Sequence, residues 1–179
     1  MKKVLVISTS LRQTSNSDLL AQQFAKGAQE AGNQVEVISL RGKTIGFCMG
    51  CLACQKTQEC VIHDDANAIA EKMLHADVIC FATPVYYYEM SGQMKTLLDR
   101  ANSLYTTDYA FRDIYLLTAS AEAEDAAADG TINGLNGWIA CYEKCRLAGV
   151  VRGGGANDPG EMEKLTGKLD EAYMMGKNI

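Results

Sequence analysis

The chain has only two prolines, two histidines and one tryptophan among its 179 residues. It also lacks any apolar run near the roughly 20 residues that a membrane-spanning helix needs, and its opening MKKVLVISTS is typical of a strand rather than a signal peptide. Long blocks of Lys and Arg are absent, and the net charge is -5, which argues against nucleic-acid or anionic-membrane partners. We therefore expect a cytoplasmic protein with no membrane contact, in which local geometry binds any anion.

The scarcity of histidine leaves few candidates for acid-base catalysis. His63 precedes an expected helix and His75 lies near the end of that helix, so both are expected at the surface, and no catalytic acid or base is assigned.

Short apolar runs alternate with segments of helical spacing along the whole chain. Continuous apolar runs are typical of strands that are covered on both faces. The strands are expected at 3–7, 35–38, 77–82, 114–118 and 149–151. Helices are expected after the polar stretches 15–17 and 64–65 and over 91–103, 132–148 and 160–176. This alternation predicts one α/β domain, residues 1–179, with helices on both faces of a parallel sheet.

The loop after the first expected strand contains no glycine, so it is neither a GxGxxG dinucleotide turn nor a Walker loop. It is instead rich in hydroxyl and amide groups, has one arginine and leads into a helix whose first turn has free N–H groups. That chemistry suits a terminal phosphate. The alternative is that these polar side chains only cap the helix and fill the turn.

The loop after the third expected strand holds Pro84 followed by the tyrosines at 86–88. Since proline cannot extend a central strand, we expect the chain to turn there and to bring the tyrosines to the strand ends beside the first loop. A flat aromatic cofactor could pack on them. Alternatively, the tyrosines anchor a half-buried loop.

Four of the seven cysteines lie in CMGCLACQKTQEC, residues 48–60, as a C-x2-C-x2-C-x5-C run. Three cysteines at such spacing can turn toward one centre, as in compact runs that hold [4Fe–4S] clusters. Free or redox-active thiols and a zinc site are the alternatives. Cys80 is expected in a buried strand, and Cys141 and Cys145 are expected to pack on a helix.

Two of these segments, STSLRQTSNSDLLA and TPVYYYEMSGQMKTLLDR, resemble the phosphate loop and the PVY…S…K…LDR segment of the flavodoxin-like NAD(P)H-dependent FMN reductase family. With the cysteine run, the chain is most similar to the iron-sulfur flavoproteins within that family. One departure is STS at the start of the loop, where the family often has GS. The resemblance implies a flavodoxin-like three-layer sandwich with a five-stranded parallel sheet in 2-1-3-4-5 order. It also implies bound FMN and a homodimer or homotetramer in which a neighbouring subunit helps to cover the flavin.

The resemblance also implies which residues contact the cofactors. The phosphate would be held by Ser10, Arg12, Ser15, Asn16 and Ser17. The flavin would be flanked by Pro84, Val85, Tyr86, Tyr87 and Tyr88, with Ala119 and Ser120 at the other edge of the ring. A cluster would be ligated by Cys48, Cys51, Cys54 and Cys60, and we expect it between the FMN and the surface.

The leading functional hypothesis is an FMN-dependent oxidoreductase that uses NAD(P)H to reduce a quinone, a flavin or another small acceptor. An alternative is an iron-sulfur flavoprotein that passes single electrons between a ferredoxin-like donor and FMN. A third is a non-enzymatic zinc or thiol redox-sensing module.

Overall fold

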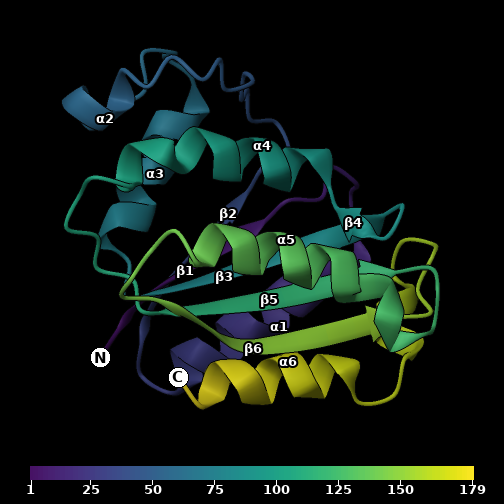
Figure 1. Cartoon of the computed structure of the whole chain (residues 1–179). Coiled ribbons are helices and arrows are strands. Elements are labelled where there is room, and N and C mark those ends of the chain that lie inside the picture. The colour runs from purple at the N-terminus through teal and green to yellow at the C-terminus, as the bar shows by residue number, and fades with distance from the viewer.

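The computed structural model describes residues 1–179 (Figure 1). Its strands are β1 (Lys3–Ser8), β2 (Gln34–Ser39), β3 (Val78–Tyr86), β4 (Glu89–Met90), β5 (Asp113–Ser120) and β6 (Arg146–Gly154). Its α-helices are α1 (Asn16–Glu30), α2 (Cys54–Thr57), α3 (Asp65–His75), α4 (Gly92–Arg100), α5 (Asp129–Ile139) and α6 (Lys168–Lys177). Three short 3₁₀ helices are η1 (Ala101–Leu104), η2 (Asp125–Ala128) and η3 (Glu161–Lys164). None of the helices combines the length and the apolar character needed to cross a bilayer.

Five parallel strands form the sheet in the order β2-β1-β3-β5-β6, and β4 pairs with β3 as a short antiparallel addition. The 2-1-3-4-5 order is therefore confirmed for the five parallel strands, with β4 as a sixth strand that the sequence did not predict. This order is that of the flavodoxin-like fold, in which the order reverses between β1 and β3. Ligands in such folds bind beyond the carboxyl ends of the strands at that reversal.

Helices cover both faces of the sheet, so the molecule has three layers (Figure 1). Alternate residues of a strand point to opposite faces. In β1, Val4 and Val6 pack in one buried cluster with α1 and α6, whereas Leu5 and Ile7 pack in the other with α3, α4 and α5. The strands are apolar along their whole length because helices bury both faces of the sheet.

Helices α1 and α6 approach each other closely because glycine stands at two contact points. A Cβ atom added to Gly27 would lie 2.0 Å from the Tyr173 carbonyl oxygen, and one added to Gly176 would lie 2.0 Å from the Phe24 carbonyl oxygen. No other residue fits at either position without separating the helices.

The expected helix over 132–148 is wrong at both ends. Helix α5 begins at Asp129 and ends at Ile139, and the chain turns before β6 begins at Arg146. The turn lets Tyr142 pack against Trp138 and donate its hydroxyl to the Ala101 carbonyl at 3.3 Å. No glycine or proline marks this break, so the helical pattern was extended too far. The expected helix over 160–176 is likewise divided into η3 and α6, with Gly167 at φ 84° before α6.

Candidate functional site

The loop between β1 and α1 ends in an N-cap whose side chain lies at the start of the helix. Ser15 is extended, and its hydroxyl accepts the Asp18 N–H at 3.1 Å. Ser10, Ser15 and Ser17 are all buried. Since the first N–H groups of a helix have no intrahelical partners, this turn joins free donors to buried hydroxyls and favours an anion.

Arg12 and Asn16 tie this loop to the segment that follows β6. The Arg12 guanidinium donates to the Asn157 carbonyl at 2.8 Å. The Asn16 side-chain amide donates to the Ala156 and Asp158 carbonyls at 3.2 and 2.9 Å, and its oxygen accepts the Met162 N–H at 3.0 Å. The side chain of Asn16 is therefore fully engaged by 156–162, which leaves its backbone N–H for any ligand.

The expected turn at Pro84 is wrong, because β3 continues through Pro84 to Tyr86. The Ala82 carbonyl accepts the Thr9 N–H on the β1 edge. The backbone groups of successive residues in a strand point alternately to its two neighbours, so the Pro84 nitrogen, like the Ala82 carbonyl, points toward β1. The pairing with β1 ends at Ser8, before the level of Pro84. Its missing N–H therefore breaks no ladder bond, and the strand can extend past its neighbour.

Tyr87 and Tyr88 form the two-residue turn between β3 and β4. Both have positive φ, 51° and 65°, as a type I′ turn requires. Tyr87 is 99% exposed and Tyr88 61% exposed, whereas Met90, which follows them in β4, is buried. The exposed apolar surface here is therefore made by the tyrosines alone.

Three buried hydroxyls join the first and second loops. The Ser91 hydroxyl lies 3.1 Å from that of Thr9 and 3.2 Å from that of Thr83, and it caps α4 by accepting the Met94 N–H at 3.3 Å. Sequence reasoning missed this role. The serine of the PVY…S segment, Ser91, acts as the N-cap of α4 and also links Thr9, just after β1, to Thr83 in β3 by hydrogen bonds.

Most of the residues predicted to bind the flavin line one cavity of about 270 Å³ at the carboxyl ends of the strands. The predicted residues in it are Ser10, Arg12, Ser15, Asn16, Ser17, Pro84, Val85, Tyr86, Tyr87 and Ala119. Ala121, Ala156 and Asn157 complete the wall. The last two were not predicted, because their segment enters the site only through its bonds to Arg12 and Asn16. Tyr88 and Ser120 do not line the cavity, and the Ser120 hydroxyl donates to the Glu122 carbonyl at 2.9 Å.

The cysteine run lies in a different part of the molecule. Helix α4 begins at the carboxyl edge of the sheet beside Ser91 and ends at Arg100, which holds the loop around the cysteines. Nine residues of helix span about 14 Å. The two cavities share no lining residue. Within one chain the cysteines therefore line a separate cavity from the one at the carboxyl ends of the strands, and the expected place of a cluster between the FMN and the surface stays a prediction.

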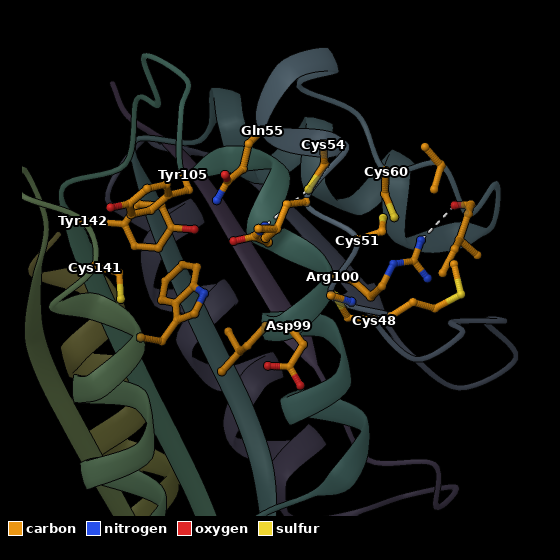
Figure 2. A pocket seen from close by; sticks show the side chains of 18 residues that line it. Cys48, Cys51, Cys54, Gln55, Cys60, Asp99, Arg100, Tyr105, Cys141 and Tyr142 are labelled. Carbon is orange, nitrogen blue, oxygen red and sulfur yellow. Dashed lines mark hydrogen bonds between the residues drawn. The ribbon is translucent and has the colours of Figure 1, made fainter.

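Cys48, Cys51, Cys54 and Cys60 line one cavity of about 680 Å³. Figure 2 shows Cys51, Cys54 and Cys60 on one side of it and Tyr105, Tyr142 and Cys141 on the other. As the side chains lie, no three His, Cys, Asp or Glu groups are close enough to hold a metal ion.

The donor set around these thiols suits thiolate ligands nevertheless. The Gly50 N–H points at the Cys48 sulfur at 3.4 Å, and the Asn102 side-chain amide points at the Cys54 sulfur at 3.3 Å. The Cys60 thiol lies beside the Arg100 guanidinium. N–H donors directed at sulfur stabilise the charged thiolate, which is the form that binds metals.

Arg100 and Asp64 form a buried ion pair beside the cysteines. The guanidinium is fully buried and bonds both carboxylate oxygens, at 2.6 and 3.0 Å. Burial by itself raises the pKa of Asp64, but hydrogen bonds from Arg100, Gly46 and Ala66 outweigh burial and lower that pKa. Burial likewise lowers the pKa of Arg100, but hydrogen bonds to Asp64 and Cys60 outweigh it and raise that pKa.

The remaining cysteines differ in setting. Cys80 is buried in β3, and burial raises the pKa of its thiol well above the ordinary value. Cys141 and Cys145 lie in the turn after α5, so their expected placement on a helix is wrong. Burial raises the pKa of Cys145 to about 11, which keeps this thiol protonated at neutral pH.

Curated relatives of the chain include iron-sulfur flavoproteins. One from Methanocaldococcus jannaschii is 39% identical over 57% of this chain and 53% of its own length. One from Methanosarcina thermophila is 28% identical over 76% of this chain and 72% of its own. The chain thus spans about half the length of the first of these relatives.

Solved structures share the fold at low sequence identity. An NAD(P)H:quinone oxidoreductase from Methanothermobacter marburgensis aligns over 99% of this chain and 98% of its own, with a TM-score of 0.77 and 18% identity. An FMN-dependent NADH-azoreductase from Bacillus anthracis, solved in complex with FMN, aligns over 99% of both chains with a TM-score of 0.66 and 14% identity.

A model of one protein family matches residues 2–142, from β1 through α5, and so includes both loops of the carboxyl-edge cavity and all four cysteines of the run. Because that match covers well over half of the chain, the protein belongs to the NADPH-dependent FMN reductase family.

Proposed function

We propose that this chain is an FMN-dependent NAD(P)H oxidoreductase that reduces a quinone, a flavin or another small acceptor. One observation carries the proposal: ten residues from three separate strand ends, chosen from the sequence, line a single cavity with a phosphate-type donor set. Family membership and the flavin-dependent neighbours of the same fold support it.

In this proposal the terminal phosphate of FMN is held by the hydroxyls of Ser10, Ser15 and Ser17, by the Arg12 guanidinium and by N–H groups of the first turn of α1. The residues from Pro84 to Tyr87 flank the ring on one side, and Ala119 and Ala121 flank it on the other. Tyr88 and Ser120 are left out because neither lines the cavity.

When bound, FMN supplies hydride acceptance from a nicotinamide and onward transfer of one or two electrons. The cavity lining contains no His, Asp, Glu, Lys or Cys. The ionisable side chains of the lining are Arg12, Tyr86 and Tyr87, and His63 and His75 are both exposed. In this proposal the protein contributes mainly binding and orientation.

A second candidate function is that of an iron-sulfur flavoprotein, and the donors aimed at the sulfurs of Cys48 and Cys54 favour it. In this reading Cys48, Cys51, Cys54 and Cys60 hold a [4Fe–4S] cluster, which would exchange single electrons with a ferredoxin-like donor. All four thiols line one cavity, and bringing them to one centre would require their side chains and the loop to move.

The test is anaerobic purification followed by an absorption spectrum, flavin extraction, metal and acid-labile sulfide analysis, and NAD(P)H oxidation with a quinone acceptor. A Cys54→Ser variant is prepared alongside. We expect FMN rather than FAD, about four irons per chain, and loss of iron but not of FMN in the variant.

The outcomes separate the candidates. Flavin with no iron or sulfide removes the cluster and leaves a plain FMN reductase. One zinc per chain without flavin supports a thiol or zinc redox sensor instead and contradicts the oxidoreductase. A colourless protein that binds no added FMN contradicts the main proposal directly.

A further inference from the structure

Arg100 is attached to both ends of the cysteine segment, residues 48–60. The guanidinium at the end of α4 donates to the Gly46 carbonyl at 2.9 Å, two residues before Cys48. It also donates to the Ile62 carbonyl at 2.8 Å, two residues after Cys60. One side chain therefore closes the base of the loop that carries the four thiols.

Asp64 holds this closure in place. Its two carboxylate oxygens accept from Arg100, and one of them also accepts the Gly46 N–H at 2.8 Å. Both backbone groups of Gly46 are therefore bound to the ion pair. Asp64 also caps α3 by accepting the Ala66 N–H at 3.0 Å, which ties the base of the loop to a helix of the core.

The residues after Arg100 reach further into the segment. Asn102 in η1 donates its side-chain amide to the Cys54 sulfur at 3.3 Å. Thr106 donates its hydroxyl to the Gln55 carbonyl at 3.2 Å. The stretch from Arg100 to Thr106 thus contacts the cysteine segment at its base, at one thiol and at α2.

We propose that Arg100 and Asn102 are positioning residues for the four cysteines: Arg100 fixes the base of the loop, and Asn102 orients and stabilises the thiolate of Cys54. This inference rests on the proposed [4Fe–4S] function of the segment. Holding the loop in place before ligands bind reduces the ordering entropy that binding would otherwise cost. An N–H donor at a ligating sulfur stabilises the more negative, reduced cluster and so raises its reduction potential.

The experiment compares Arg100→Lys and Asn102→Asp with the wild-type chain, all prepared anaerobically. Arg100→Lys keeps the charge but cannot reach both carbonyls with one planar fork. Asn102→Asp keeps the shape but removes the donor. Two controls match these changes elsewhere: Arg146→Lys in an exposed ion pair, and Asn136→Asp on the exposed face of α5.

Three quantities are measured: the rate of iron release to a chelator, the midpoint potential of the cluster, and the rate of proteolytic cleavage within residues 48–60 of chelator-treated protein. We expect Arg100→Lys to release iron about 10- to 100-fold faster, because altering residues that contact metal ligands typically weakens metal binding by this factor. We also expect this variant to be cleaved faster. Asn102→Asp should retain iron with a more negative midpoint potential. Both controls should match the wild type.

Wild-type values of iron release and cleavage in Arg100→Lys, or a wild-type potential in Asn102→Asp, overturn the assignment of that residue. If the wild-type chain itself holds no iron or sulfide, the cluster proposal fails and the assignment of Asn102 fails with it. The assignment of Arg100 is then decided by proteolysis alone, since faster cleavage in Arg100→Lys supports it and equal cleavage overturns it. If Arg100→Lys fails to fold, as judged by loss of bound FMN, Asp64→Asn is measured in its place with the same expectations.

Discussion

Arg12 is the only cation in the lining of the carboxyl-edge cavity. If the FMN phosphate binds as proposed, Arg12→Ala removes a charge-assisted contact worth about 1.5–3 kcal/mol. We expect FMN to bind roughly 10- to 100-fold more weakly. Fluorescence titration of the flavin-free protein measures this change. Arg146→Ala, which removes an arginine at the other edge of the sheet, is the control. Unchanged affinity in Arg12→Ala would mean that the phosphate lies elsewhere.

Asp64 should make the stability of the chain depend on pH. Because the pKa of Asp64 is lowered in the folded chain, its carboxylate contributes its full stability above the unfolded pKa of about 4. That contribution is lost as the pH falls through the folded pKa. Asp64→Asn leaves Arg100 buried without its partner, which should cost about 3–5 kcal/mol near pH 7.

The measurement is the free energy of urea unfolding from pH 7 down to pH 2. The difference between the wild type and Asp64→Asn should shrink below about pH 4. Asp108→Asn serves as a control, because Asp108 is 91% exposed and solvent screens its pair with Lys144. A difference that stays constant across the pH range would contradict the role of the Asp64 charge.

At the scale of elements, the β3–β4 turn holds two aromatic residues in a conformation that L-amino acids avoid. Tyr88→Gly relieves the strain of a left-handed backbone conformation but gives the unfolded chain more conformational entropy. The free energy gained from the first effect should exceed the cost of the second, so we expect this variant to stabilise the fold by about 0.5–1 kcal/mol. Tyr105 is a similarly exposed tyrosine with φ −57°. Tyr105→Gly should therefore destabilise the fold. Urea unfolding of both variants decides the point, and effects of equal sign would show that strain is not the cause.

The resemblance to the flavodoxin-like reductase family implied the order of the five parallel strands. The sequence predicted the strands themselves because each is a short apolar run between polar loops. It missed β4, whose two residues depend on a turn that Tyr87 and Tyr88 form against their intrinsic preference. It extended the helix expected over 132–148 too far, because the break before β6 is caused by packing of Tyr142 and not by a local signal. Tertiary contacts outweighed local pattern in both cases.

The same contrast applies to the two sites. The residues implied by the resemblance line one cavity, since strand ends converge wherever strands are parallel and adjacent, and their contact with a flavin stays a prediction. The position of the cysteines could not be predicted, since the path of the chain from 40 to 64 is set by Arg100, a buried side chain that no spacing rule connects to Gly46 or Ile62.

At the scale of the molecule, the carboxyl-edge cavity is small for a flavin and has exposed tyrosines at its rim. Its volume of about 270 Å³ lies at the lower edge of the roughly 300–1,000 Å³ typical of ligand pockets. We therefore expect at least a dimer, in which a second copy covers the flavin ring and the exposed side chains of Tyr87 and Tyr88. Light scattering at micromolar concentration tests this expectation. Tyr87→Ser should weaken the dimer, with Tyr105→Ser as the control, and a wild-type monomer would contradict the expectation.

The closure of the cysteine segment by a single guanidinium has a consequence for how such a chain can be altered. Because the Gly46 and Ile62 carbonyls accept from the same side chain, the loop leaves and re-enters the fold at nearly one point. Short connections across such a point cost little chain entropy. We expect that residues 47–61 can be exchanged as a cassette, for a Gly-Ser bridge or for another metal-binding loop, while far-UV circular dichroism and FMN content stay at wild-type levels. The cysteine segment would then be a unit that can be added to or removed from this fold without rebuilding the rest of the chain.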